Sequence, residues 1–272
     1  MRRLHALLLA GVAAAVALPG CEKQPVQVGF RPPAGATYRY ELRVQSTTTT
    51  RLGDEAPDRA VDDAVLESRD TVLSSTPDEV RVQVVLARSG SPARTFVVRF
   101  DRFAQLAGVE AVDGLPPDVL GPGAFPEFLP AAATAPPNRP LAPGERWTID
   151  ARPNLPGTSA DTRLQGSGRL VSVGSSGGRK VATLKAETRL PLRSSATLRD
   201  AAVSLDGVET TTVNATRALA DGSVQSSTAV TKGRFDLVLT GAAAARASVT
   251  GTLDVEIRST TRRLPDDGDK KS

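Results

Sequence analysis

The stretch GATYRYELRVQSTTTTRL, residues 35–52, alternates between apolar and polar side chains with a period of two. Tyr38, Tyr40, Leu42 and Val44 fall on one side of an extended chain, and the residues between them are charged or polar. Antiparallel strands that bury one face and expose the other have this pattern. The stretch therefore predicts a long, half-buried β-strand.

The same alternation recurs along the chain, separated by short stretches rich in Gly, Pro, Asp and Ser, which favour turns. The alternating stretches lie at 80–84, 96–100, 235–239 and 249–257, and the turn stretches at 76–79, 89–92, 175–178 and 220–223. We expect an all-β fold, with a large antiparallel sheet that forms a half-barrel, a barrel or a sandwich and has at most one or two short helices. Residues 57–70 fit either a helix or a continued strand, and 101–112 is a second helix candidate.

Two parts of the chain open in a similar way. Gly35 is followed three residues later by Tyr38, and Gly144 is followed three residues later by Trp147. This predicts a β domain over 30–263, whose halves, 30–113 and 141–263, are either related units or strands that begin alike by coincidence.

A proline-rich connector, 114–140, separates these halves. Proline cannot donate to a β ladder, so the connector is a linker or a loop lying on the sheet. Phe125, Phe128 and Leu129 make part of it apolar, which fits a lid over an apolar cavity or a plug in the core. The polar tail, 264–272, is expected to be disordered.

The N-terminus has the features of a secretory signal peptide. Arg2 and Arg3 precede an uninterrupted apolar run, residues 6–18. This run of 13 residues is shorter than the roughly 20 that a helix needs to span a bilayer. A short cationic start followed by such a run is typical of a signal that is cleaved on export.

The run ends in Leu18-Pro19-Gly20-Cys21, which resembles the lipobox of bacterial lipoproteins. The resemblance implies cleavage after Gly20 and attachment of diacylglycerol to the Cys21 thiol. Residues 1–20 are then the signal peptide, and 21–29 a lipidated N-terminus and tether. Because two acyl chains hold a protein stably on a membrane, the resemblance implies an exported protein, anchored to the outer face of the cytoplasmic membrane or to the outer membrane.

Residue counts exclude several kinds of chemistry. The single histidine, His5, lies in the predicted signal, so the mature chain lacks the base of a His-dependent triad and the usual zinc ligands. Gly174–Gly178 matches the G-x-S-x-G pattern of a nucleophile elbow, but without a histidine we interpret it as a hairpin turn. We expect no enzyme activity, no metal and no cofactor.

Removing the signal leaves 32 Lys and Arg against 30 Asp and Glu, a formal charge of +2, and nucleic-acid binding is not expected. The body resembles uncharacterised all-β envelope lipoproteins that begin a strand with G-x-x-Y/W. More distantly it is similar to LolA-like lipid carriers, in which a curved sheet holds acyl chains. We expect a cell-envelope lipoprotein with a non-catalytic interaction or structural role, partnered by the membrane through Cys21 and by an envelope protein. The alternative is a carrier or binding module for a lipid or other apolar ligand.

Overall fold

A computed structural model describes residues 24–101, 106–113, 134, 136–152, 162–198, 201–241 and 248–265. These residues form eleven strands, and none of them lies in a helix long and apolar enough to cross a membrane. The strands are β1 Thr37–Leu52, β2 Asp58–Ser75, β3 Glu79–Arg88, β4 Arg94–Asp101, β5 Leu106–Val112, β6 Arg146–Ala151, β7 Leu164–Ser176, β8 Arg179–Leu198, β9 Ala201–Ala218, β10 Val224–Gly241 and β11 Val249–Arg263.

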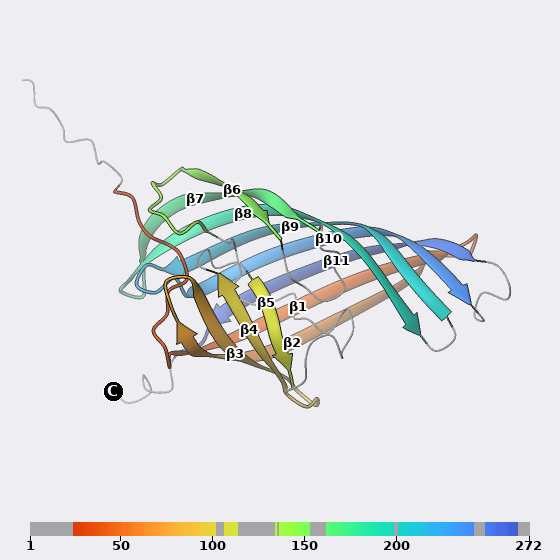
Figure 1. Cartoon of the computed structure of the whole chain (residues 1–272), viewed down its shortest axis with the longest axis horizontal. Helices are drawn as coiled ribbons and strands as arrows, with labels where there is room; N and C mark the ends of the chain where they lie inside the picture. The colour runs from red at the N-terminus through yellow and green to blue at the C-terminus, as the bar shows by residue number, and fades with distance from the viewer. Residues whose placement is uncertain are drawn as a thin grey trace, which may run out of the picture.

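All eleven strands belong to one antiparallel sheet, in the order β5-β4-β3-β2-β1-β11-β10-β9-β8-β7-β6. The first and last strands, β1 and β11, pair in the interior of the sheet, from Tyr40 opposite Arg263 to Leu52 opposite Gly251. The sheet stays open, because β5 and β6 at its two edges are not paired with each other. The predicted all-β fold is confirmed, in the form of an open, curled sheet (Figure 1).

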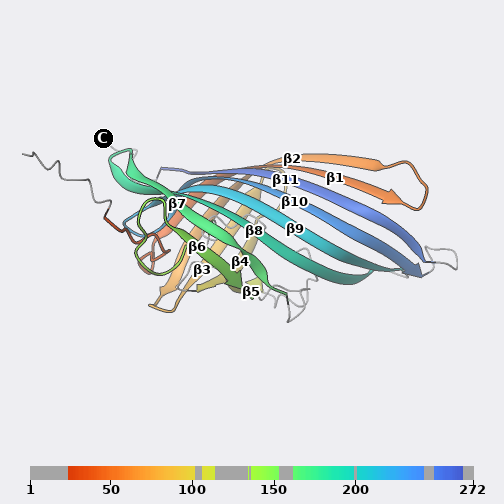
Figure 2. The ribbon, with the colours of Figure 1, turned by 90° about the horizontal axis from the view of Figure 1, so that it is seen from above.

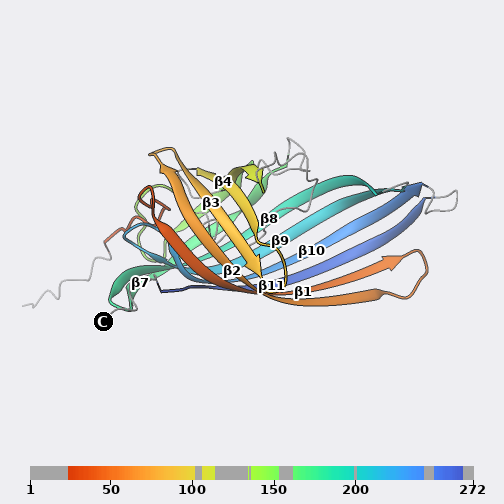
Figure 3. The same cartoon turned by 90° about the horizontal axis from the view of Figure 1, so that it is seen from below.

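The strands differ greatly in length, and this divides the sheet into two regions. Strands β1, β2 and β8–β11 have 15 to 20 residues, whereas β3–β7 have 6 to 13. Figures 1 and 3 show the long strands running together beyond the shorter ones. We call the region with the short strands the core end and the region beyond it the extended end. Figure 2 shows the same contrast from above.

The alternation read from the sequence determines which side chains are buried at the core end. Tyr38, Tyr40 and Leu42 of β1 are buried, as predicted, with the apolar residues of β2–β5 in one hydrophobic cluster. A second cluster contains Trp147 and Ile149 of β6 with the apolar residues of β7 and β8. The two hydrophobic clusters thus cover the inner face of the sheet at its core end.

The N-terminal segment enters the core at Val26 and Val28, within the stretch 21–29 that was predicted to be a tether. Val26 forms a β-bridge with Leu141, and Val28 is fully buried in the second cluster. Two residues later Phe30 packs in the first cluster, edge-on to Phe100 at 5.8 Å between ring centroids. The segment therefore joins the two clusters, and apolar burial explains why it leaves the solvent.

Of residues 57–70, which fit a helix or a strand, all but Pro57 belong to strand β2, and the second helix candidate contains strand β5. In β2 the apolar Val61 and Val65 are four residues apart, which suggests a helix face. They lie instead on the outer face of the sheet, 56% and 53% exposed. The ladder between β2 and β1 runs over 14 residue pairs and outweighs this local signal.

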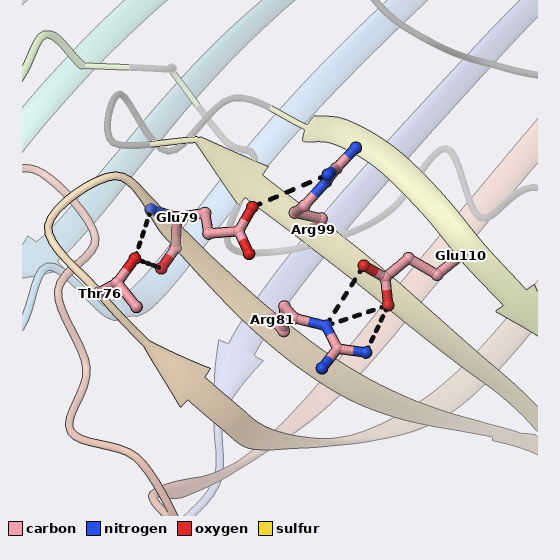
Figure 4. Close-up of polar contacts among 5 residues, drawn as sticks. All are labelled: Thr76, Glu79, Arg81, Arg99 and Glu110. Carbon is pink, nitrogen blue, oxygen red and sulfur yellow. Dashed lines mark hydrogen bonds and ion pairs between the residues drawn. The ribbon is translucent and has the colours of Figure 1, made fainter.

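The predicted turns are confirmed. The stretch 175–178, which matches a nucleophile elbow, is the hairpin between β7 and β8, with positive φ at Gly177 and Gly178. At the β2–β3 hairpin the Thr76 hydroxyl accepts a hydrogen bond from the Glu79 N–H at 3.1 Å (Figure 4). Figure 4 also shows the ion pair between Arg81 and Glu110, 2.7 Å apart, which joins β3 to β5 on the exposed face.

Packing of Trp147 against Gly168 gives a test of the second cluster. A Cβ atom at Gly168 would overlap the Trp147 indole, so Gly168→Ala should destabilise the protein by about 1–3 kcal/mol through overpacking. Gly174→Ala in the same strand is the control, because no heavy atom lies within 4 Å of its added Cβ. Urea unfolding followed by the fluorescence of Trp147, the single tryptophan, measures both. Equal stability of the two variants would contradict this packing.

Candidate functional site

None of the site residues predicted from the sequence lies among the described residues. Gly20 and Cys21 precede residue 24, and Phe125, Phe128 and Leu129 fall between residues 113 and 134. These predicted site residues therefore lie outside the described part of the chain, and the candidate site is sought among other side chains.

At the extended end, beyond the two hydrophobic clusters, the inner face carries mostly apolar side chains, with Glu209 among them opposite Gly233 and Leu190. Paired positions place side chains of neighbouring strands in rows: Leu253 is opposite Phe235, which is opposite Gly207, and Leu237 is opposite Leu205. Together these rows form a surface that we call the apolar inner patch, consisting of Leu190, Leu192, Val203, Leu205, Phe235, Leu237, Leu239, Leu253 and Val255. Among the described residues, neither hydrophobic cluster includes any of these nine.

The outer face of the same strands has the opposite character. It carries ion pairs between neighbouring strands, such as Arg193–Asp206 at 2.8 Å and Arg234–Asp254 at 3.8 Å. Exposed pairs of this kind contribute little to stability. Their effect is to keep the outer face hydrated, so the inner face is where an apolar molecule would bind.

Glycines allow one aromatic ring to lie flat on the patch. A Cβ at Gly207 would come within 2.6 Å of Phe235 Cδ1, and one at Gly233 within 2.6 Å of its Cε2. The Phe235 ring therefore lies over both glycines. The Cβ atom of any other residue at position 207 or 233 would occupy the space of the ring. Phe235 and Leu237 are 6% and 8% exposed, whereas the other patch residues are partly exposed.

The dimensions of the patch suit a chain-like apolar ligand. From Gly233 to Leu239 the patch runs about 20 Å along β10, at roughly 3.3 Å per residue. Across β8 to β11 it spans about 14 Å, from three strand spacings of roughly 4.8 Å. The resulting area of about 300 Å² is comparable to the largest apolar patches of monomeric proteins, which are often functional.

Polar groups are also buried at the core end. The Tyr38 hydroxyl donates to Asp221 at 2.8 Å, and the fully buried Arg217 donates to the Gly222 carbonyl at 2.7 Å. Burial lowers the pKa of Arg217 to about 10, with Tyr40 and Asp221 opposing the shift, so the guanidinium remains charged at neutral pH. These contacts fix the turn between β9 and β10 against β1.

Asp70 is the buried carboxyl group of this region. It lies opposite Tyr38 in the β1–β2 ladder and accepts a hydrogen bond from the Ser68 hydroxyl. Burial raises the pKa of Asp70 from 3.8 to about 7, although the Ser68 hydrogen bond opposes the shift. The same burial, together with the charge of Asp70, raises the pKa of Tyr40.

Sequence reasoning identified some of these residues and missed others. The stretches 235–239 and 249–257 were predicted as strand faces, but their proximity depends on long-range pairing that the local pattern does not specify. Asp70 and Arg217 were missed. The sequence did contain a signal for Asp70, because it is spaced by two residues from Ser68 and Val72. That spacing places all three on the inner face of β2.

Comparison with known proteins does not identify a family. No family model and no curated protein matches the chain. Among solved structures, an outer membrane channel from Pseudomonas putida F1 is 10% identical, covers 91% of this chain and 100% of its own, and has a TM-score of 0.23. Two structures of OmpT, an outer membrane protein of Vibrio cholerae, are also similar: a loop L8 deletion mutant with 10% identity and an in-vitro folded trimer with 8% identity. Each match covers 85% of this chain and 100% of the OmpT chain, with a TM-score of 0.17. At such TM-scores these similarities carry no inference about function.

The Asp70 carboxyl should make stability depend on pH. The folded state holds its proton up to about pH 7 and the unfolded state releases it near 3.8, so the free energy of unfolding falls by roughly 4 kcal/mol as the pH rises between these values. Asp70→Asn should remove this fall and stabilise the protein at pH 8. Urea midpoints at pH 5 and pH 8 measure the effect.

Asp63→Asn, on the exposed outer face of the same strand, is the matched control and should retain the wild-type pH dependence. If the urea midpoint changes between pH 5 and pH 8 by the same amount in Asp70→Asn and in the wild type, Asp70 is not the source of the pH dependence.

Proposed function

We propose that this protein is an exported, lipid-anchored module of the cell envelope that binds the acyl chain of a lipid on the apolar inner patch. The observation that carries the proposal is the contrast between the two faces of the extended end. Nine apolar side chains line the inner face outside the hydrophobic clusters, while charged pairs cover the outer face.

Acyl chains suit the patch better than compact apolar ligands do. The patch is about 20 Å long, somewhat longer than the roughly 15 Å that one leaflet contributes to the hydrocarbon core of a bilayer. Aliphatic side chains make up eight of its nine residues, with Phe235 as the single aromatic. Such a surface binds through non-directional burial of apolar area.

A purely structural or protein-binding role is the second candidate, and an unpaired strand edge favours it. Strand β3 pairs with β2 only from Leu66 onward, so among the described residues Asp58–Val65 has no ladder partner on the side away from β1. However, this edge carries Asp58, Arg59, Asp62 and Asp63, and charged edges oppose the addition of another strand. The acyl-chain proposal is therefore the stronger of the two.

The predicted anchor would hold the core end near the membrane. Cys21 precedes Gln24 by three residues, which reach about 10 Å when extended. The chain then enters the core at Val26 and Val28. A lipid held on the extended end would thus lie at the opposite end of the sheet from the anchor.

A charge placed on the patch tests ligand binding. Leu205→Asp should reduce binding of a fluorescent fatty acid at least tenfold, because a carboxylate would have to be desolvated beside the acyl chain. Ser204→Asp is the matched control, since Ser204 is the neighbouring residue and is exposed on the outer face. Lipid extraction and mass spectrometry of protein purified from its host should detect bound lipid in the wild type and in Ser204→Asp.

Equal binding by the two variants, with no co-purified lipid in either, would rule out the inner patch as a lipid site. Thermal unfolding of both variants shows whether any loss reflects unfolding instead.

Replacement of Cys21 tests the anchor separately. Cys21→Ser removes the thiol that would carry diacylglycerol, so the protein should move from the membrane fraction to the soluble fraction, and incorporation of radiolabelled palmitate should cease. Continued palmitate labelling of Cys21→Ser would show that the predicted lipobox is not the attachment site.

A further inference from the structure

A second, polar site lies at the core end, far from the apolar inner patch. A hollow of about 660 Å³ opens between the β7–β8 hairpin, strands β9 and β10, and the end of β11. Six of its thirteen lining residues carry hydroxyl groups, two are arginines, and none is Asp or Glu. The apolar inner patch contributes no residue to it, so the two sites are independent.

Four of the hydroxyl residues form a row across four neighbouring strands. Ser172 of β7 is paired with Thr183 of β8, Thr183 with Thr216 of β9, and Thr216 with Ser226 of β10. Neighbouring strands are about 4.8 Å apart. The row therefore presents hydroxyl groups at a spacing that allows two neighbouring ones to contact one small ligand.

β-bulges lie at both ends of this row. The β7–β8 ladder shifts register between Leu170 and Ser172, and the β9–β10 ladder shifts between Val224 and Ser226. Bulges redirect side chains, sharpen the local twist, and occur preferentially beside functional sites. Here one bulge adjoins Ser172 in β7 and the other adjoins Ser226 in β10, the first and last residues of the hydroxyl row. Figure 1 shows β7 to β10 side by side in the sheet.

Two arginines line the hollow, Arg179 and Arg263. Arg263 is oriented by a hydrogen bond to the Ser223 hydroxyl at 3.0 Å and by the Tyr38 ring, whose centroid lies 4.8 Å from the Arg263 Cζ. Arg179 is exposed at the start of β8, and the structure shows no ion pair for it within the described part of the chain. Because no Asp or Glu lines the hollow, the charge of Arg179 is available to an anion.

We propose that this hollow binds a phosphate group through Arg179 and the row of hydroxyls. A phosphate oxyanion accepts several hydrogen bonds at once, and arginine matches its geometry with a bidentate fork. Hydroxyl groups donate to the remaining oxygens. The group can belong to free phosphate or to a lipid head group, and the hollow lies at the end of the sheet where the chain enters from the N-terminus.

The hollow is connected to that entry by hydrogen bonds. The Arg31 N–H donates to the Asp221 carbonyl at 2.7 Å, in the turn between β9 and β10. From the same turn, the Ser223 hydroxyl accepts a hydrogen bond from Gln225, which lines the hollow. An anchor at Cys21 would therefore bring the hollow close to lipid head groups.

The test measures inorganic phosphate binding by calorimetry, using protein purified from cells that express the full chain. Arg179→Glu should weaken binding at least tenfold, and Thr216→Val, which removes one hydroxyl of the row at nearly constant size, should weaken it several-fold. Arg189→Glu in the same strand is the matched control, since Arg189 is also exposed and lies outside the hollow, and it should bind like the wild type. Thermal unfolding confirms that each variant is folded.

A second arm distinguishes the source of the phosphate. In the Cys21→Ser background, which removes the anchor, sedimentation with phosphatidylglycerol vesicles is compared for the same variants. Loss of vesicle binding in Arg179→Glu but not in Arg189→Glu supports a lipid head group, and loss of inorganic phosphate binding alone supports free phosphate. The proposal is overturned if neither probe binds, or if Arg179→Glu and Arg189→Glu bind both probes equally.

Discussion

The register between neighbouring strands decides which side chains of this sheet face the core and which face the solvent. Side chains in a strand alternate between its two faces, so a slip of one residue would turn every apolar group of that strand toward the water. The ladders of β8 to β11 keep this phase over more than ten residues each. As a result, the inner face of β8 to β11 is mostly apolar and their outer face carries ion pairs, including in the part that no second layer covers among the described residues.

The two ends of the sheet use this constraint differently. At the core end, short strands and the N-terminal segment fill the inner face with side chains, including Val28 and Phe30. At the extended end the same face continues, but its apolar residues belong to neither hydrophobic cluster. A single pattern of alternation therefore provides both the stability of the fold and a surface suited to an apolar ligand.

The sequence was sufficient for properties that depend on neighbouring residues. Alternation in 35–52 and glycine at 177 and 178 predicted a strand and a hairpin, because phase and backbone conformation are local. It was insufficient where distant residues decide the outcome. The ladder with β1 makes 57–70 a strand, burial makes Asp70 an unusual acid, and the hydroxyl row exists only because four separate strands align Ser172, Thr183, Thr216 and Ser226.

The pairing of β1 with β11 also constrains the order in which the protein can form. The chain is synthesised from its N-terminus, so β1 exists long before its partner, and the two strands are separated by almost the whole sequence. Contacts at such separation form slowly, because the entropy of closing the loop must be overcome first. Until β11 arrives, one edge of β1 offers unpaired N–H and C=O groups to any other strand. The period between synthesis and completion of the sheet is thus when this protein is most exposed to aggregation.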